Sequence, residues 1–198
     1  MGSSPRTVYV PPILDDSHPI LNSKDITISH NPLVTARIYL PKLIISNDQN
    51  QLQKLPILVY FHGGGFIFES AFSQVFDNYF NNLIPLANVI VVSVEYRRAP
   101  EYQLPACYHN AWYALKWVSS HSTANNNTNY FEPWLINYGD FNRVFIGGDS
   151  AGVGSEPVLH HNNDLAFIVW DLIYPSAPGG IDNPVANPIN ETFSVFST

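Results

Sequence analysis

Three runs of apolar residues constrain the fold of this chain more than any other feature of its sequence. They are LPILVYF at 55–61, NVIVVSVEY at 88–96 and VFI at 144–146. A strand with one solvated face alternates apolar and polar residues, whereas a strand of a parallel sheet is covered on both faces and is apolar throughout. The three runs therefore predict buried strands of a mostly parallel sheet.

Helical patterns separate the predicted strands. Apolar residues recur at spacings of three and four over 73–87, and again over 105–121, which opens with Pro105. Because of this spacing we expect a crossover helix in each segment, and Pro105 supports a helix start in the second, since proline is favoured in the first turn. The order strand, helix, strand, helix, strand predicts an α/β fold with right-handed crossovers and helices on both faces of the sheet.

The residues before the first apolar run divide into two parts. Residues 1–23 are rich in proline and polar side chains, and we expect an N-terminal arm there. Residues 24–30 and 34–41 carry β-branched side chains in rough alternation around an Asn-Pro pair, which indicates a β-hairpin. The 198 residues suffice for one domain, which we place at 24–198.

Composition narrows the classes of partner. The net charge of −7 and the scattered Lys and Arg residues argue against nucleic acid or an anionic membrane and favour a neutral small molecule. A single cysteine, Cys107, excludes an internal disulfide and offers no metal cluster, so we expect neither a cofactor nor a metal. The sequence shows no signal-peptide pattern and no run of about 18 apolar residues, which predicts a cytoplasmic protein without a membrane span.

A serine stands in the turn that follows the third apolar run. Gly148-Asp149-Ser150-Ala151-Gly152 fits the pattern G-x-S-x-G. This pattern marks the strained strand-to-helix turn that holds a serine hydroxyl outward at the top of an α/β sheet. It predicts Ser150 as a nucleophile and Asp149 as a residue that orients the turn. Such a serine needs a neighbouring base to take its proton.

A glycine run, His62-Gly63-Gly64-Gly65, follows the first apolar run directly. Without side chains, the backbone N–H groups of such a run can approach a substrate closely. Hydrolysis of an ester places negative charge on the carbonyl oxygen, and each donor aimed at that oxygen is worth about 3–4 kcal/mol. We expect the N–H groups of Gly63 and Gly64, with that of Ala151, to form this oxyanion hole.

Charged residues after the second run, and two late histidines, have simpler interpretations. Glu95, Arg97, Arg98 and Glu101 are predicted to form a structural network that braces the loop before the next proline. The pair His160-His161 is predicted to be solvated, because no third ligand follows at metal spacing.

Several longer segments carry a resemblance to a known family. They are YFHGGGF, VVSVEYRRAPE, LPACYHNAWYALKWV, GGDSAG and PSAPGGIDNP. These resemble the plant carboxylesterases of the hormone-sensitive-lipase-like α/β-hydrolase group, which also contains 2-hydroxyisoflavanone dehydratases and gibberellin receptors. The resemblance implies an α/β-hydrolase fold, a Ser-Asp-His triad and small esters or acylated plant metabolites as substrates. It also implies that Ser150 is the nucleophile and that His62 shapes the glycine loop.

The acid and the base of a triad are hard to find in this sequence. In this fold the acid and then the histidine follow the serine along the chain. The last histidines are His160 and His161, and the only acidic residue between them and Ser150 is Glu156, too close behind the serine to reach it from a separate strand. Relatives continue through two further strands that carry the acid and the histidine. We therefore expect a sheet that is incomplete at its C-terminal end and turnover about 10⁴–10⁶ times below that of a complete relative.

The segment after the serine also departs from the family. Gly154 and Pro157 disfavour the helix that follows the serine in relatives, and the resemblance resumes only at 170–188. This indicates an internal deletion. Residues 143–147 would then form an exposed apolar edge of the sheet, which favours pairing with another chain.

Three functions stay open from the sequence. The first is hydrolysis of small carboxylic esters through Ser150. The second is binding of a small molecule without catalysis, as in the gibberellin receptors, which resemble a variant with serine in place of the third glycine and of the alanine after the nucleophile. Gly65 and Ala151 favour the esterase branch. The third is a non-functional fragment. Dehydratase activity would use the same site.

Overall fold

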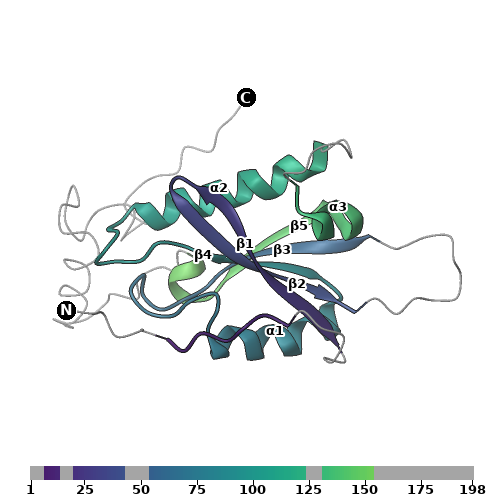
Figure 1. Ribbon diagram of the computed structural model, residues 1–198, viewed down its shortest axis with the longest axis horizontal. Coiled ribbons are helices and arrows are strands. Elements are labelled where there is room, and N and C mark those ends of the chain that lie inside the picture. The colour runs from purple at the N-terminus through teal and green to yellow at the C-terminus, as the bar shows by residue number, and fades with distance from the viewer. Residues whose placement is uncertain (1–6, 14–19, 43–53, 124–130, 154–198) are drawn as a thin grey trace, which may run out of the picture.

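A computed structural model describes residues 7–13, 20–42, 54–123 and 131–153 (Figure 1). Its strands are β1 (Leu21–His30), β2 (Leu33–Pro41), β3 (Leu55–Phe61), β4 (Ile90–Glu95) and β5 (Gly139–Gly148). Its helices are α1 (Gln74–Ala87), α2 (Ala106–Ser120) and α3 (Pro133–Tyr138), with short 3-10 turns η1 (His121–Thr123) and η2 (Ser150–Val153). The α/β class predicted from the sequence is confirmed.

The strands form one mixed sheet in the order β1-β2-β4-β3-β5. Strand β3 pairs in parallel with both β4 and β5, and β2 runs antiparallel to its neighbours β1 and β4. Only β2 therefore opposes the common strand direction, which confirms a mostly parallel sheet. The hairpin of β1 and β2 was expected, although β1 starts at Leu21, inside the stretch assigned to the arm.

Helices cover both faces of the sheet (Figure 1). On one face, Phe76, Phe80 and Ile84 of α1 pack with side chains such as Tyr60 and Val91 in one apolar cluster. On the other face, α2 and α3 pack in a second cluster that contains alternate residues of the same strands. Strands β3 and β4 each contribute residues to both clusters, so their sequences are apolar nearly throughout, as the runs at 55–61 and 88–96 predicted.

The helix ends follow local chemistry. Helix α1 ends where Asn88 adopts a left-handed φ of 48° and its N–H bonds to the carbonyl of Ile84 at 2.8 Å. Helix α3 was not predicted. The Glu132 side chain caps it by accepting a bond from the Trp134 N–H, and Pro133 occupies its first turn.

Strand β5 corrects one expectation and confirms another. The run at 144–146 was interpreted as a short buried strand, but β5 has 10 residues, and Val144, Phe145 and Ile146 are 40%, 56% and 64% exposed. Within the part of the chain that the structure describes, β5 pairs with β3 alone. The predicted apolar edge at 143–147 is therefore present.

Residues of the N-terminal arm lie against the sheet and the start of α1. Tyr9 forms an isolated bridge with Ser73, and the Val10 N–H bonds to the carbonyl of Phe72 at 2.9 Å. Further on, the Ser23 N–H bonds to the carbonyl of Ile13 at 2.7 Å. The division into an arm at 1–23 and a domain at 24–198 stays a prediction.

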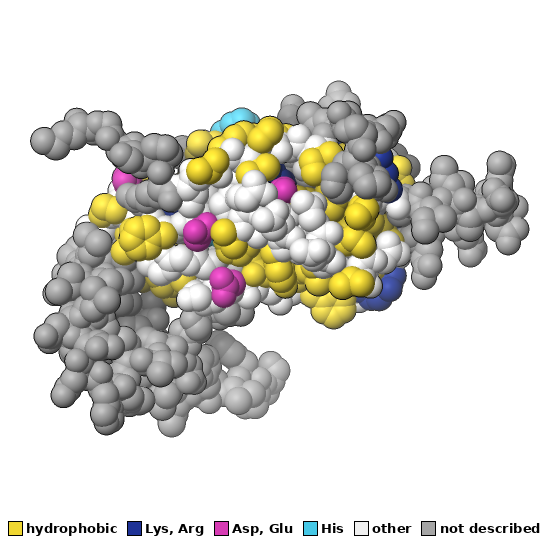
Figure 2. All heavy atoms as spheres, turned by 90° about the horizontal axis from the view of Figure 1, so that it is seen from below, with side chains coloured by type: hydrophobic (Ala, Val, Ile, Leu, Met, Phe, Trp, Pro, Cys, Tyr) yellow, Lys and Arg dark blue, Asp and Glu magenta, His cyan; other side chains and the backbone are white. Residues whose placement is uncertain are grey.

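The surface carries few charged side chains, as expected from a sequence in which 13% of the residues are charged. Viewed from the α1 side, the described atoms show hydrophobic patches between isolated charged groups and no basic patch (Figure 2). No helix among the described residues combines the length and the apolar character needed to cross a membrane.

Candidate active site

Parallel pairing of β3 and β5 brings the two glycine motifs together. Phe61, the last residue of β3, lies opposite Gly148, the last residue of β5. Both motifs therefore start at the carboxyl edge of the sheet, where open α/β folds bind ligands. The approach is close, because a Cβ atom on Gly63 would lie 2.8 Å from the Asp149 carboxylate and 2.9 Å from its backbone carbonyl.

The serine turn has the strained geometry that its sequence predicts. Ser150 is exposed and has φ 50°, an uncommon conformation for a residue with a side chain. The Gly152 N–H closes the turn on the carbonyl of Asp149 at 2.8 Å. The turn is fastened to β3 by a 3.3 Å hydrogen bond from the Asp149 N–H to the carbonyl of Phe61.

The glycine run needs glycine for two different reasons. Gly64 has φ 100°, its carbonyl accepts the N–H of Phe68 at 2.8 Å, and a Cβ atom on it would lie 2.3 Å from the Phe68 carbonyl. Gly65 has φ 62°, but a Cβ atom on it would meet open space, with no atom within 4 Å. Conformation and space both restrict Gly64, whereas conformation alone restricts Gly65.

His62 is a buried, neutral part of the loop. Its Nδ1 lies 2.8 Å from the carbonyl of Gly63, and its ring stacks on Tyr96 with centroids 4.1 Å apart. Burial lowers the pKa of His62 to about 4, although the bond to Gly63 acts the other way. The imidazole is therefore uncharged near neutral pH.

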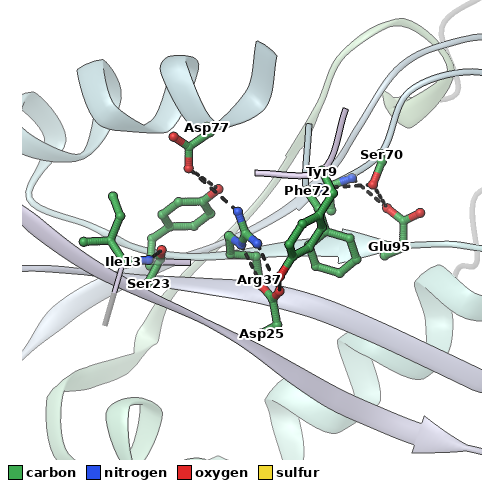
Figure 3. A network of polar contacts seen from close by, with 11 residues as sticks. Tyr9, Ile13, Ser23, Asp25, Arg37, Ser70, Phe72, Asp77 and Glu95 are labelled. Carbon is green, nitrogen blue, oxygen red and sulfur yellow. Dashed lines mark hydrogen bonds and ion pairs between the residues drawn. The ribbon is translucent and has the colours of Figure 1, made fainter. Parts of the chain in front are cut away.

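Glu95 fastens the far end of the glycine loop, and its ion pair with Arg98 is one contact of the predicted charged network, whereas Arg97 bonds to Asn110 instead. Its carboxylate accepts the Ser70 hydroxyl at 2.9 Å and the Ala71 N–H at 2.7 Å (Figure 3), and it pairs with Arg98 at 3.1 Å. Burial raises the pKa of Glu95, while Arg98 and the two hydrogen bonds lower it. Arg98 also donates to the carbonyl of Glu69. The sequence did not single out Tyr96, whose position at the end of β4 was the available signal.

The described residues supply no base that is hydrogen-bonded to Ser150. Among residues 7–13, 20–42, 54–123 and 131–153, no histidine hydrogen-bonds to Ser150, and no group of three metal-ligating side chains occurs. Glu156, Pro157, His160 and His161 are outside the described residues, as are Gly154 and the segment 170–188. Cys107 is buried, and burial raises the pKa of its thiol to about 12, so it is not a second nucleophile.

The predicted site residues thus lie in two adjacent turns. The structure brings together His62, Gly63 and Gly64 with Gly148, Asp149 and Gly152, and Ser150 and Ala151 stand in the second turn. Their catalytic roles stay predictions.

Comparison with known proteins agrees with this arrangement. A family model described as alpha/beta hydrolase fold matches residues 58–155. The chain is 45% identical to a 2-hydroxyisoflavanone dehydratase of Glycyrrhiza echinata, over 96% of this chain and 66% of that protein. It is 41% identical to Hydrolase 3 of Catharanthus roseus, over 96% of this chain and 69% of that protein.

A solved structure shows the same fold. The esterase of Pyrobaculum calidifontis matches with a TM-score of 0.64 and 26% identity, over 90% of this chain and 64% of that one. The chain spans 66% and 64% of the length of two dehydratase relatives, from Glycyrrhiza echinata and Glycine max. With both the fold and the sequence in agreement, the chain belongs to the α/β-hydrolase family of the esterases and the plant 2-hydroxyisoflavanone dehydratases.

Proposed function

We propose that this chain carries the nucleophile and the oxyanion hole of a serine carboxylesterase. In the proposed reaction the Ser150 hydroxyl attacks the carbonyl carbon of an ester, and a base takes its proton and passes it to the departing alcohol. Water then attacks the acyl-serine and releases the carboxylic acid. The N–H groups of Gly63, Gly64 and Ala151 would stabilise the charge on the carbonyl oxygen. The observation that carries the proposal is the pairing of β3 with β5. It places the glycine run, which follows β3, beside the strained Ser150 turn, which follows β5.

The electrostatics of the glycine loop suit this role. The oxyanion is stabilised by preorganised dipoles in a site that does not reorganise as the charge forms. The carbonyl of Gly64 already accepts hydrogen bonds from the N–H groups of Ile67 and Phe68. A Cβ atom on Gly64 would clash with the Phe68 carbonyl, so the loop backbone has little room to move. Each N–H donor is expected to contribute about 3–4 kcal/mol to the stability of the transition state.

We expect slow turnover from these 198 residues. No acid and histidine follow Ser150 in the order and at the distance along the chain that this fold uses. Losing the base and its orienting acid reduces turnover by about 10⁴–10⁶-fold, while binding and the oxyanion donors still accelerate the reaction.

Small, neutral esters are the substrate class that we propose. The chain carries a net charge of −7, which disfavours anionic substrates. Dehydration is a second candidate, favoured by the 45% identity to a protein named as a 2-hydroxyisoflavanone dehydratase. We also propose a cytoplasmic location, which a fluorescent fusion in plant cells would test.

The first experiment is hydrolysis of p-nitrophenyl acetate by the purified chain, with Ser150→Ala as the control. Turnover that exceeds the control supports the proposed nucleophile, and its size measures how much activity survives without a triad. A rate that approaches ordinary esterases would mean that another base serves Ser150, with His160 and His161 as the first residues to replace. Rates equal to the Ser150→Ala control would contradict the proposal.

A further inference from the structure

Tyr96 lies beside the glycine run because of the register between β3 and β4. Phe61 of β3 is opposite Val94 of β4, so the next positions along the two chains place His62 near Glu95 and Gly63 near Tyr96. Tyr96 is only 3% exposed. Its ring lies parallel to the imidazole of His62, with an interplanar angle of 9°.

Two hydrogen bonds join this stacked pair to the backbone of the run. The Tyr96 hydroxyl donates to the carbonyl of His62 at 2.6 Å and lies 3.3 Å from the carbonyl of Gly63. The carbonyl of Gly63 is 2.8 Å from Nδ1 of His62, and a carbonyl can only accept, so Nδ1 carries the proton. Each of the two carbonyls thus has its own short hydrogen bond.

Peptide geometry transmits these bonds to the other side of the backbone. In a trans peptide the C=O and the N–H are coplanar and point in opposite directions. The carbonyl of His62 shares its peptide group with the N–H of Gly63, and the carbonyl of Gly63 shares its group with the N–H of Gly64. A donor on each carbonyl therefore fixes the direction of one N–H and polarises it.

We propose that Tyr96 is a positioning residue, whose hydroxyl, together with the His62 imidazole, holds the two N–H groups of the glycine run toward the oxyanion. The catalytic use of this arrangement rests on the proposed function, but the arrangement itself does not. Burial raises the pKa of Tyr96, so the hydroxyl keeps its proton and remains a donor. A purely structural tyrosine would need the ring alone, which phenylalanine also supplies.

The His62–Gly63 peptide group can be observed by itself. Gly63 is the only glycine of this sequence that follows a histidine. Protein labelled with ¹³C at histidine carbonyls and with ¹⁵N at glycine should therefore give one carbonyl–amide correlation in an NMR spectrum. In Tyr96→Phe we expect the His62 carbonyl carbon and the Gly63 amide proton to move to lower chemical shift. The matched control is Tyr108→Phe, because Tyr108 is half-buried and its ring lies tilted against that of Phe66 in the loop, with centroids 5.9 Å apart, yet it bonds to neither carbonyl.

Kinetics on p-nitrophenyl acetate then test the use of the arrangement. Loss of an oxyanion donor lowers kcat by about 10²–10³-fold. In Tyr96→Phe the N–H groups of Gly63 and Gly64 are still present but are no longer held in direction, so we expect the Ser150-dependent kcat to fall by about tenfold or more. KM should change by less than about twofold, because the hydroxyl contributes to the transition state and not to ground-state binding. Tyr108→Phe should retain the wild-type kcat.

The outcomes separate this inference from the proposed function. An unmoved carbonyl resonance in folded Tyr96→Phe overturns the inference, and so does a moved resonance with an unchanged Ser150-dependent kcat. If wild type and Ser150→Ala hydrolyse equally, the proposed function fails, and the carbonyl shift still decides whether Tyr96 holds the peptide group. Should Tyr96→Phe not fold, incorporation of 3-fluorotyrosine into the wild-type chain decides, because its more acidic hydroxyl is a stronger donor and should move the His62 carbonyl carbon to higher chemical shift, whereas an unmoved resonance means that no tyrosine donates to it.

Discussion

Gly152 shows how closely the serine turn is packed against β3. A Cβ atom at this position would lie 1.9 Å from the carbonyl oxygen of Phe61 and 2.6 Å from its carbonyl carbon. Both atoms belong to the backbone of a central strand, so neither can move without disturbing the sheet. The glycine of the motif is therefore required by space, in addition to any requirement of the reaction.

We expect Gly152→Ala to lower the free energy of unfolding by about 3 kcal/mol, the upper part of the range for overpacked sites. Gly147→Ala is the control, because its Cβ would lie 3.2 Å from the flexible end of Leu58. That change should stay within about 1 kcal/mol of wild type. Urea unfolding followed by circular dichroism measures both variants. Equal stability of the two would contradict this account of the turn.

His62 should make stability depend on pH. An unfolded histidine titrates near pH 6.5, whereas burial lowers the pKa of His62 to about 4. Between these values the unfolded chain binds a proton that the folded chain does not. His62 therefore leaves the free energy of unfolding unchanged above about pH 6.5. As the pH falls below that value, His62 lowers the free energy of unfolding, by about 3 kcal/mol at pH 4.

The variant His62→Gln tests this contribution, and it also replaces the ring nitrogen that lies 3.6 Å from the Glu95 carboxylate. Glu95 acts in the opposite direction, because its pKa is raised by burial and the folded state takes up its proton first. His121 acts in the same direction as His62, because burial lowers its pKa too. Urea unfolding at several pH values should therefore show a shallower loss of stability in His62→Gln, by about one proton between pH 6.5 and 4. The same slope in both proteins would mean that His62 is not buried as a neutral base.

At the scale of elements, Arg37 of β2 ties together three parts of the chain (Figure 3). Its guanidinium is fully buried and makes a two-point bond to Asp25 of β1, at 2.6 and 3.0 Å. The same group lies 5.5 Å from the ring of Tyr9 and 5.2 Å from the ring of Phe72. The N-terminal arm is therefore held where the loop of the glycine run enters α1.

We expect Arg37→Met to destabilise the protein by about 2 kcal/mol or more, because it removes the two-point bond to Asp25 and takes the guanidinium away from the buried Asp77 carboxylate, 3.9 Å distant. Tyr9→Phe is the control, since it removes one exposed hydrogen bond of 2.8 Å to the same carboxylate. That loss should be below about 1 kcal/mol. Thermal unfolding of the two variants provides the comparison, and a mild effect of Arg37→Met would show that the ion pair does not hold the arm.

The elements differ in how far the sequence predicted them. Strand β3 and helices α1 and α2 have ends within a residue of the predicted 55–61, 73–87 and 105–121, because long apolar runs and periods depend on local order alone. Helix α3 has 6 residues, fewer than two turns, so periodicity carries no signal there. Its only sign was the Glu-Pro pair at its start.

The site divides in the same way. Ser150 and the glycine run follow from their motifs, because glycine requirements are set by the backbone of each turn. The contact of Tyr96 with His62 depends on which strands are neighbours and in what register, which composition and periodicity do not contain. The exposure of β5 was predicted from the family resemblance and not from the run itself, whose apolar residues indicate burial.

At the scale of the molecule, the two edges of the sheet differ in kind. Strand β1 at one edge has Lys24 and Asp25 among its residues, and charged groups oppose pairing with another sheet. Strand β5 at the other edge exposes Val144, Phe145 and Ile146 on its two faces. Among the described residues no strand pairs with the outer side of β5. The backbone N–H and C=O groups on that side therefore lie beside exposed apolar side chains.

We expect the purified chain to self-associate through β5, and a charge on that strand should prevent it. Ile146→Lys should shift the protein toward monomer in analytical ultracentrifugation, because a charge on an edge strand opposes strand pairing. Val75→Lys is the matched control, since Val75 of α1 is 60% exposed against 64% for Ile146 but lies on a helix. If the wild type sediments as a sharp monomer, or if the two lysine variants dissociate it equally, the edge of β5 is not what joins the copies.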